Sequence, residues 1–259
     1  MSNLFTAENK RWESRRAIPW KKVAAALAVL AVVGAAVAGG YIWKGKSDNV
    51  EQIAAEPVPS ELSSVEISGV SFLLNQFTRS AREVRGTISD GPLKANVTGS
   101  VTADGKFGFG TVNAAGVDGS TLLADGVTYV KGSPTFWSAV GVQTNFPGWV
   151  RIRPGFLGDR IYLPAATVSA ALAPVERATI LGNVYTPSSD ATAVFGANGL
   201  ERVDLPGYNV TVTPADNEGV RNTVRPMFDA LGPVANLERS GSAWGIIPPP
   251  PPAPEGEPG

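Results

Sequence analysis

Apolar and polar residues alternate without a break over residues 93–102, and this pattern is the clearest in the chain. The apolar positions are Leu93, Ala95, Val97, Gly99 and Val101, with a polar residue after each. A period of two predicts a β-strand with one dry and one solvated face. A similar run at 82–88, turn signals at 89–92 and 103–105, and Asp-Gly pairs at 118–119 and 125–126 predict an antiparallel meander.

Helical patterns are few and short. Residues 164–173 begin with a proline at a first-turn position, and residues 224–231 form a second run of this kind. Residues 235–247 predict a closing hairpin that turns at Ser240-Gly241-Ser242. The predicted fold class is therefore α+β: one curved antiparallel sheet, an incomplete barrel, with a few short helices over residues 65–247.

Such a sheet must bury its apolar face, and the two short helices are too small to cover eight or more strands. The uncovered area predicts either a groove for a lipid, between the sheet and the helices at 164–173 and 224–231, or a surface for a partner.

An uncharged stretch over residues 23–43 predicts one transmembrane helix. It is long enough to cross roughly 30 Å of hydrocarbon, and aromatic residues lie at both of its ends. Residues 1–22 hold six basic and two acidic residues, a balance of +4 that predicts a cytoplasmic N-terminus. The alternative is a signal peptide cleaved after Ala36-Val37-Ala38. Both readings place the main domain outside the plasma (inner) membrane.

The flanking segments are polar or proline-rich. Residues 44–64 predict a linker, and residues 248–259 predict a disordered proline-rich tail that serves as a spacer or as a ligand for a partner. If the linker is flexible, its length averages roughly 25 Å end to end.

Composition excludes much chemistry. The chain has no cysteine and no histidine, which excludes disulfides, a Ser-His-Asp triad and most zinc sites. Asp90, Asp104, Asp118 and Asp125 lie in turns, where aspartate is explained by backbone hydrogen bonding. We therefore expect no enzyme activity, no catalytic residues, no metal site and no cofactor. Residues 23–259 carry a net charge of −5, so nucleic acid is not an expected partner.

The order of elements resembles a known family. An alternating hairpin, the strand DGVTYVK, a small polar break, Phe136-Trp137, Gly148-Trp149-Val150 and a short helix follow one another. This order is similar to the actinobacterial LppX/LprA/LprF/LprG lipoproteins and, more distantly, to LolA-type half-barrel carriers. The similar part covers roughly residues 65–247 and is sharpest at 81–175. The resemblance implies an incomplete barrel around helices, an apolar pocket for acyl chains, and a role in handling envelope lipids.

The chain departs from that family because it lacks the lipidated cysteine and has a predicted membrane anchor instead. In this respect it also resembles the mycobacterial trehalose monomycolate transport factor A type of accessory protein. The resemblance implies a stationary assistant of lipid transport that binds a lipid or glycolipid, an integral-membrane transporter or envelope complex, or both. The alternative is a structural adaptor of a membrane complex with no ligand pocket.

Ten residues are candidates for the lipid pocket or partner rim. The apolar candidates are Val97, Val101, Phe107, Phe109, Tyr129, Phe136, Trp137 and Trp149. A closed core, in which these rings only supply buried area, is the alternative. Arg151 and Arg153 are candidates for binding a phosphate, sulfate or sugar head group. A solvated strand face balanced by Asp159 is the competing interpretation.

Overall fold

The computed structural model describes residues 59–250, which form a sheet of fourteen strands with short helices. The strands are β1 (Ser60–Glu61), β2 (Arg82–Asp90), β3 (Leu93–Val101), β4 (Gly108–Ala114), β5 (Val117–Ala124), β6 (Val127–Gly132), β7 (Trp149–Arg151), β8 (Thr179–Leu181), β9 (Val184–Ser188), β10 (Ala191–Gly196), β11 (Gly199–Leu205), β12 (Tyr208–Pro214), β13 (Val234–Ser240) and β14 (Ala243–Ile247). The helices are α2 (Ser64–Thr78), α3 (Pro134–Ala139), the 3₁₀ turn η1 (Phe156–Asp159), α4 (Ala165–Ala171) and α5 (Asn217–Asp229).

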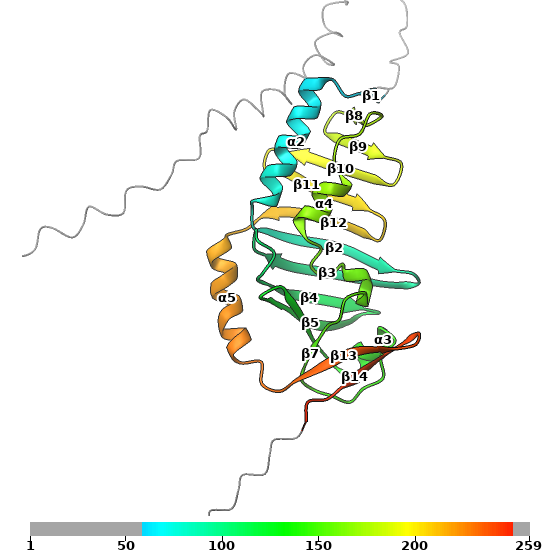
Figure 1. Cartoon of the computed structure of the whole chain (residues 1–259), viewed down its shortest axis with the longest axis vertical. Coiled ribbons are helices and arrows are strands. Elements are labelled where there is room, and N and C mark those ends of the chain that lie inside the picture. Colours follow the sequence, from blue (N-terminus) through cyan, green and yellow to red (C-terminus); the bar gives the residue numbers. More distant parts are fainter. Residues whose placement is uncertain (1–58, 251–259) are drawn as a thin grey trace, which may run out of the picture. The chain divides into compact units, whose positions relative to one another are not determined.

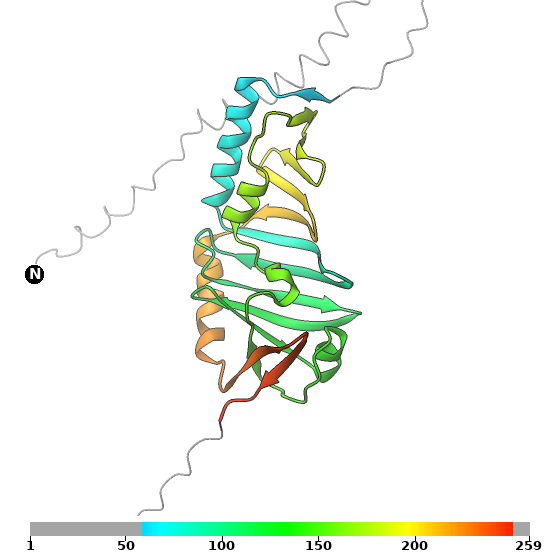
Figure 2. The same cartoon turned by 45° about the vertical axis from the view of Figure 1, so that its right-hand side comes forward.

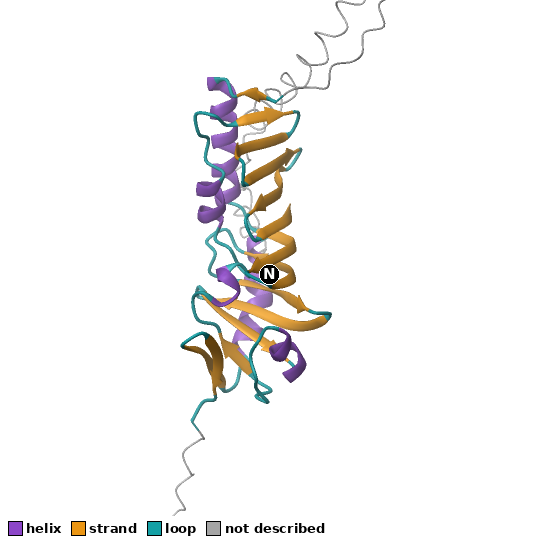
Figure 3. Ribbon diagram, turned by 90° about the vertical axis from the view of Figure 1, so that its right-hand side faces the viewer, coloured by secondary structure: helices purple, strands orange, loops and turns teal. Residues whose placement is uncertain are grey.

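The sheet is open and twisted, and its strands follow the order β1-β8-β9-β10-β11-β12-β2-β3-β4-β5-β6-β7-β13-β14 (Figure 1). The strands turn progressively along the sheet, as Figure 3 shows. Every pair is antiparallel except β7 and β13, which run parallel. This confirms the predicted mostly-sheet α+β class, the meander from β2 to β6, and the hairpin of β13 and β14.

One face of the sheet is apolar across nearly all strands, and we call it the inner face. It carries Val97, which lies opposite Gly86 on β2 and Val112 on β4. Directly paired residues on neighbouring strands share a face. The pairing therefore identifies which residues of each strand from β8 to β14 lie on the inner face. The side chains in register on this face include Ile180, Tyr185, Ala193, Val203, Val210, Val84, Val97, Val112, Val130, Val150, Ala235 and Leu237, all buried.

The opposite, outer face is mostly polar over β11, β12, β2 and β3, whereas Leu181, Val184 and Val194 form an apolar group on it over β8–β10. On β3, Thr98 lies between Arg85 and Thr111 on the neighbouring strands. This confirms the predicted division of residues 93–102 into a dry and a solvated face, since Val97 is only 3% exposed.

Helix α2 covers the inner face at one end of the sheet. It packs on β11, and α4 packs beside it (Figures 1 and 2). Its start is fixed by a capping box, in which the Glu66 amide donates to the Ser63 hydroxyl (3.3 Å) and the Ser63 amide donates to the Glu66 carboxylate (2.7 Å). This helix was not predicted from the sequence, and its first residue and β1 lie within the predicted linker at 44–64.

Helix α5 covers the outer face at the other end of the sheet. Val220 and Val224 of α5 pack with Leu122 and Ala124, which are the even-numbered positions of β5. The odd-numbered Thr121 belongs to the inner face, because it pairs with Val130. The expectation that the helices near 164–173 and 224–231 line one groove is therefore wrong: α4 and α5 lie on opposite faces.

Helix α3 seals the inner face near β5 and β6. Ser133 caps it by accepting a hydrogen bond from the Phe136 amide (3.1 Å), and Pro134 occupies its first turn. The Phe136 ring lies on two glycines: a Cβ at Gly132 or Gly119 would lie 2.2 or 2.9 Å from the ring. The polar break in the sequence is thus a helix start that buries an aromatic ring against bare backbone.

The predicted transmembrane helix at 23–43 and the tail beyond residue 250 lie outside the described residues. Within residues 59–250, no helix is both long and apolar enough to cross a bilayer.

The register yields a direct test of the two faces. Val97→Glu would place a carboxylate in the apolar layer between Gly86 and Val112, and we expect it to lower the free energy of unfolding by more than about 3 kcal/mol. Thr98→Glu would face Arg85 across the solvated side, and we expect a change within about 0.5 kcal/mol. Chemical denaturation of both variants measures the difference. Similar losses for both would mean that the register is wrong.

Candidate functional site

A loop over residues 152–164, which we call the crossing loop, runs over the inner face between β7 and α4. Its central turn η1 packs against β2. Three hydrogen bonds attach its second half to the sheet: Tyr162 to Thr121 (2.7 Å between hydroxyls), Arg160 to the Pro206 carbonyl (3.3 Å), and Arg82 to the Leu163 carbonyl (3.2 Å). The loop therefore covers the middle of the inner face, between α3 and α4.

The crossing loop is held in an unusual backbone conformation. Leu157 and Asp159 have positive φ angles of 52° and 59°, and Gly155 and Gly158 have φ of 89° and 60°. Residues other than glycine rarely adopt this left-handed region. Asp159 fixes part of the turn because its carboxylate accepts a hydrogen bond from the Gly155 amide (2.8 Å).

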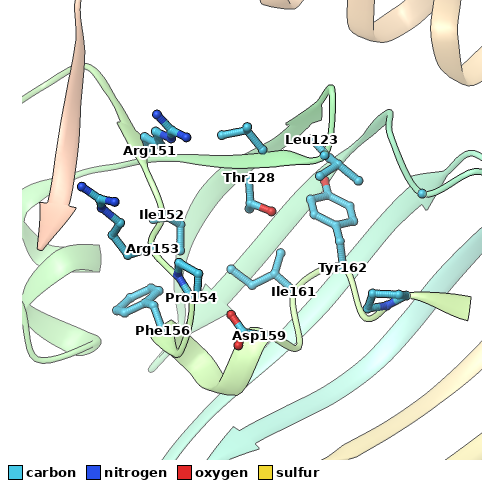
Figure 4. A pocket seen from close by; sticks show the side chains of 14 residues that line it. Leu123, Thr128, Arg151, Ile152, Arg153, Pro154, Phe156, Asp159, Ile161 and Tyr162 are labelled. Atoms are coloured by element: carbon cyan, nitrogen blue, oxygen red, sulfur yellow. The ribbon is translucent and has the colours of Figure 1, made fainter. Parts of the chain in front are cut away.

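Two hollows open on either side of the crossing loop. The first, the arginine hollow, has a volume of about 460 Å³, and Figure 4 shows its lining side chains. Leu123 and Thr128 of the inner face form its floor, and Phe156, Ile161 and Tyr162 of the crossing loop form a wall. Phe156 is buried, and its ring stacks edge-on against Trp244 of β14, with 5.6 Å between centroids.

Both predicted head-group residues contribute to the lining of the arginine hollow (Figure 4), but Arg151 pairs with Tyr129 and so occupies an outer-face position of β7. Arg153 pairs with Glu238 of β13 at 3.4 Å, and both side chains are about half exposed. Within residues 59–250, Arg151 forms no ion pair, so its charge is free for an external anion. Asp159, which was expected to balance these arginines, instead accepts from backbone.

The second hollow lies beside α4, and we call it the α4 hollow. Its volume is about 470 Å³. Thr167 and Ala171 of α4 form one side, and Leu205 and Tyr208 of β11 and β12 form the other. Leu163 of the crossing loop also lines it, so the loop is a wall that both hollows share.

The eight apolar candidate residues do not surround one cavity. Val97, Val101, Phe136 and Trp137 are buried in the closed core of the inner face. Phe107, Phe109, Tyr129 and Trp149 are partly buried on the outer face, where they pack against α5. The expectation that they share one pocket or rim is wrong, because the strand alternation that buries one group turns the other group to the opposite side.

The predicted site residues include neither the lining of the α4 hollow nor Arg82, which donates a hydrogen bond to the Leu163 carbonyl beside it. Arg82 is 3% exposed and shares the inner face with Val84 and Ile88. The sequence contains a signal for Arg82: in the run REVRGTI, it alternates in step with Val84 and Ile88, which predicts that all three lie on the same face of the strand. Leu163 and Tyr208 carry no comparable signal, because only the folded chain brings them to the same hollow.

Within residues 59–250, no three acidic side chains gather where they could hold a metal ion. No protein-family model, curated protein or solved structure matches this chain.

Tyr208 lines the α4 hollow, and its buried phenol makes the free energy of unfolding depend on pH in the alkaline range. Burial raises the pKa of its phenol to about 12, although the nearby Arg82 charge opposes the shift. In the unfolded chain the phenol titrates near 10.0, so the folded state loses stability as the pH rises from about 10 to about 12. We expect the free energy of unfolding to fall by about 2 kcal/mol less in Tyr208→Phe than in the wild type between about pH 9 and pH 11.5. Denaturation curves at both pH values measure this, and parallel losses would show that Tyr208 is solvated.

Proposed function

We propose that the domain of residues 59–250 binds the acyl chain of a lipid or glycolipid on the inner face of its sheet. The observation that carries the proposal is the pair of hollows, of about 460 and 470 Å³, beside the crossing loop. Both volumes fall within the roughly 300–1,000 Å³ of typical ligand pockets. Each buried methylene contributes about 0.8 kcal/mol, so half of a long chain suffices for tight binding.

The polar end of the ligand has a counterpart at the arginine hollow. Arg153 lines the hollow, and its only ion-pair partner within residues 59–250 is the half-exposed carboxylate of Glu238; Arg151 is exposed and forms no ion pair within these residues, but it occupies an outer-face position of β7. A guanidinium at the rim of an apolar cavity is suited to a phosphate, sulfate or sugar head group. The inner-face hollow would then hold the chain, and Arg153 would hold the head.

The wider role rests on the sequence. A predicted anchor at 23–43 would place this domain on the outer side of the inner membrane as a single-pass envelope protein. The resemblance to LolA-like and LprG-like proteins supports a part in lipid transport. The predicted tether favours a stationary assistant that works beside an integral-membrane lipid exporter, without crossing the envelope.

A structural adaptor without a ligand is the second candidate, and two observations favour it. Phe136 and Trp137 are fully buried, so the aromatic core is closed. On α2, Val65, Ile67 and Phe72 are exposed at 59%, 39% and 43%, which leaves apolar surface for a partner.

Lipid retention by the full chain separates the two candidates. We expect native mass spectrometry of the protein, purified from its host membrane in mild detergent, to show about one bound lipid per chain. Thr128→Trp and Ala171→Trp fill the arginine hollow and the α4 hollow, respectively, with a bulky ring, and at least one of them should lower retention several-fold. Thr98→Trp on the polar outer face is the matched control. A protein without lipid, or equal retention by all three variants, would favour the adaptor.

A further inference from the structure

Beyond helix α5, the outer face of the sheet carries two exposed cations among aromatic and apolar side chains. Helix α5 packs on β3, β4 and β5. On the same face, Lys131 of β6, Arg151 of β7 and Ile247 of β14 are exposed. Tyr129 of β6 and Trp149 of β7 are partly buried and extend the apolar surface under α5 toward them. We call these five residues the outer strip.

The strand register places the outer strip on adjacent strands. Arg151 pairs directly with Tyr129 on one side and with Asn236 of β13 on the other, and Asn236 pairs with Ile247. The other two members lie two positions away along β6 and β7, so they share this face. Because neighbouring strands lie about 4.8 Å apart, roughly 15 Å of sheet separates Ile247 from Tyr129.

Neither cation of the outer strip belongs to an ion pair within residues 59–250. The carboxylate of Glu238, on the strand next to β7, pairs with Arg153 instead. The aromatic surface continues onto α5, because the ring centroids of Tyr129 and Phe228 lie 6.3 Å apart and Phe228 is 38% exposed. Such a surface suits a ligand that offers prolines to the rings and carboxylates to the cations.

The chain itself supplies a segment of this composition directly after the outer strip. Residues 248–252 are five consecutive prolines that follow Ile247, and Glu255 and Glu257 come soon after them. Proline has no amide donor, so this segment cannot pair with β14 as a further strand. A polyproline segment instead docks on aromatic rings through its side chains. At about 3.1 Å per residue, Glu255 can lie up to roughly 25 Å from Ile247, which brings the whole strip within reach.

We propose that the proline-rich tail, residues 248–259, docks on the outer strip of its own domain, with its prolines on the two aromatic rings and its two glutamates paired with Lys131 and Arg151. Exposed ion pairs are individually weak. A tethered segment, however, is present at an effective concentration of about a millimolar, so weak contacts suffice. The inference goes beyond lipid binding and does not depend on it, and it gives Arg151 a partner on the face where its strand places it.

Distances between two spin labels on the full chain in phosphatidylcholine nanodiscs test the inference. The chain has no native cysteine, so Ala253→Cys in the tail and Thr211→Cys on the exposed outer face of β12 can carry the labels. Double electron–electron resonance then measures the distribution of distances between them. A docked tail should give one narrow distribution, because its position relative to the sheet is fixed.

Charge reversal on both sides of the contact shows whether the ion pairs hold the tail. Lys131→Glu together with Arg151→Glu should widen the distribution at least about twofold, because a released tail samples many positions. Both side chains are exposed, so the fold tolerates these changes. Adding Glu255→Lys and Glu257→Lys to the same chain should restore the narrow distribution.

Lys94→Glu with Lys106→Glu is the matched control. It changes the net charge by the same amount at two exposed lysines outside the strip, and it should leave the distribution narrow. Equal widths in all variants, or a narrow distribution that survives the reversal of Lys131 and Arg151, would overturn the inference. A narrow distribution that disappears when labelled chains are diluted with unlabelled chains would assign the strip to the tail of a second copy and would also overturn it.

Discussion

The structure depends on one constraint: the strand register extends a single apolar face from β8 to β14, and that face must be shielded from water. The alternation of side chains fixes which residues belong to it, and a shift of one residue would turn all of them outward. No one helix is long enough to cover so wide a face. The chain covers it in parts, with α2 and α4 at one end, α3 at the other, and the crossing loop between them.

This division of the cover explains where the hollows lie. Helices pack closely on the sheet and leave little space beneath them. In α3, for example, the Phe136 ring lies directly on Gly119 and Gly132. The crossing loop buries Phe156, Leu157 and Ile161, but it has no regular helical surface to pack on the sheet, and a few hydrogen bonds attach it there. The two cavities occur on either side of this loop, the least regular part of the cover. The same loop supplies a wall of each hollow.

Arg82 lies where these features meet, because it contacts α2 through Phe77 and the crossing loop through Leu163. A charge at that point is poorly suited to a closed core. One of its terminal nitrogens is buried there without a hydrogen-bond partner within residues 59–250, which destabilises the folded chain.

The local pattern of the sequence was sufficient for the strands, because period-two alternation and Asp-Gly turns are short-range signals. Residues 93–102 were assigned to their correct faces, and the hairpin at 235–247 was found. Helix α2 was missed although its capping box, Ser63 and Glu66, was visible. The candidate site was poorly predicted for a physical reason. Aromatic rings close in sequence, such as Tyr129 and Trp137, lie on opposite faces of a sheet, and no local pattern reports which helix covers which face.

The central claim is that an acyl chain occupies the inner face beside the crossing loop. Because the chain has no native cysteine, single cysteines report on this directly. Thr128→Cys and Ala171→Cys lie in the two hollows, and Thr98→Cys lies on the outer face. The rate of maleimide labelling, measured in nanodiscs with and without added palmitate, should fall at least about tenfold at one of the two hollow positions and stay constant at Thr98. Unchanged rates at both hollow positions would contradict the account.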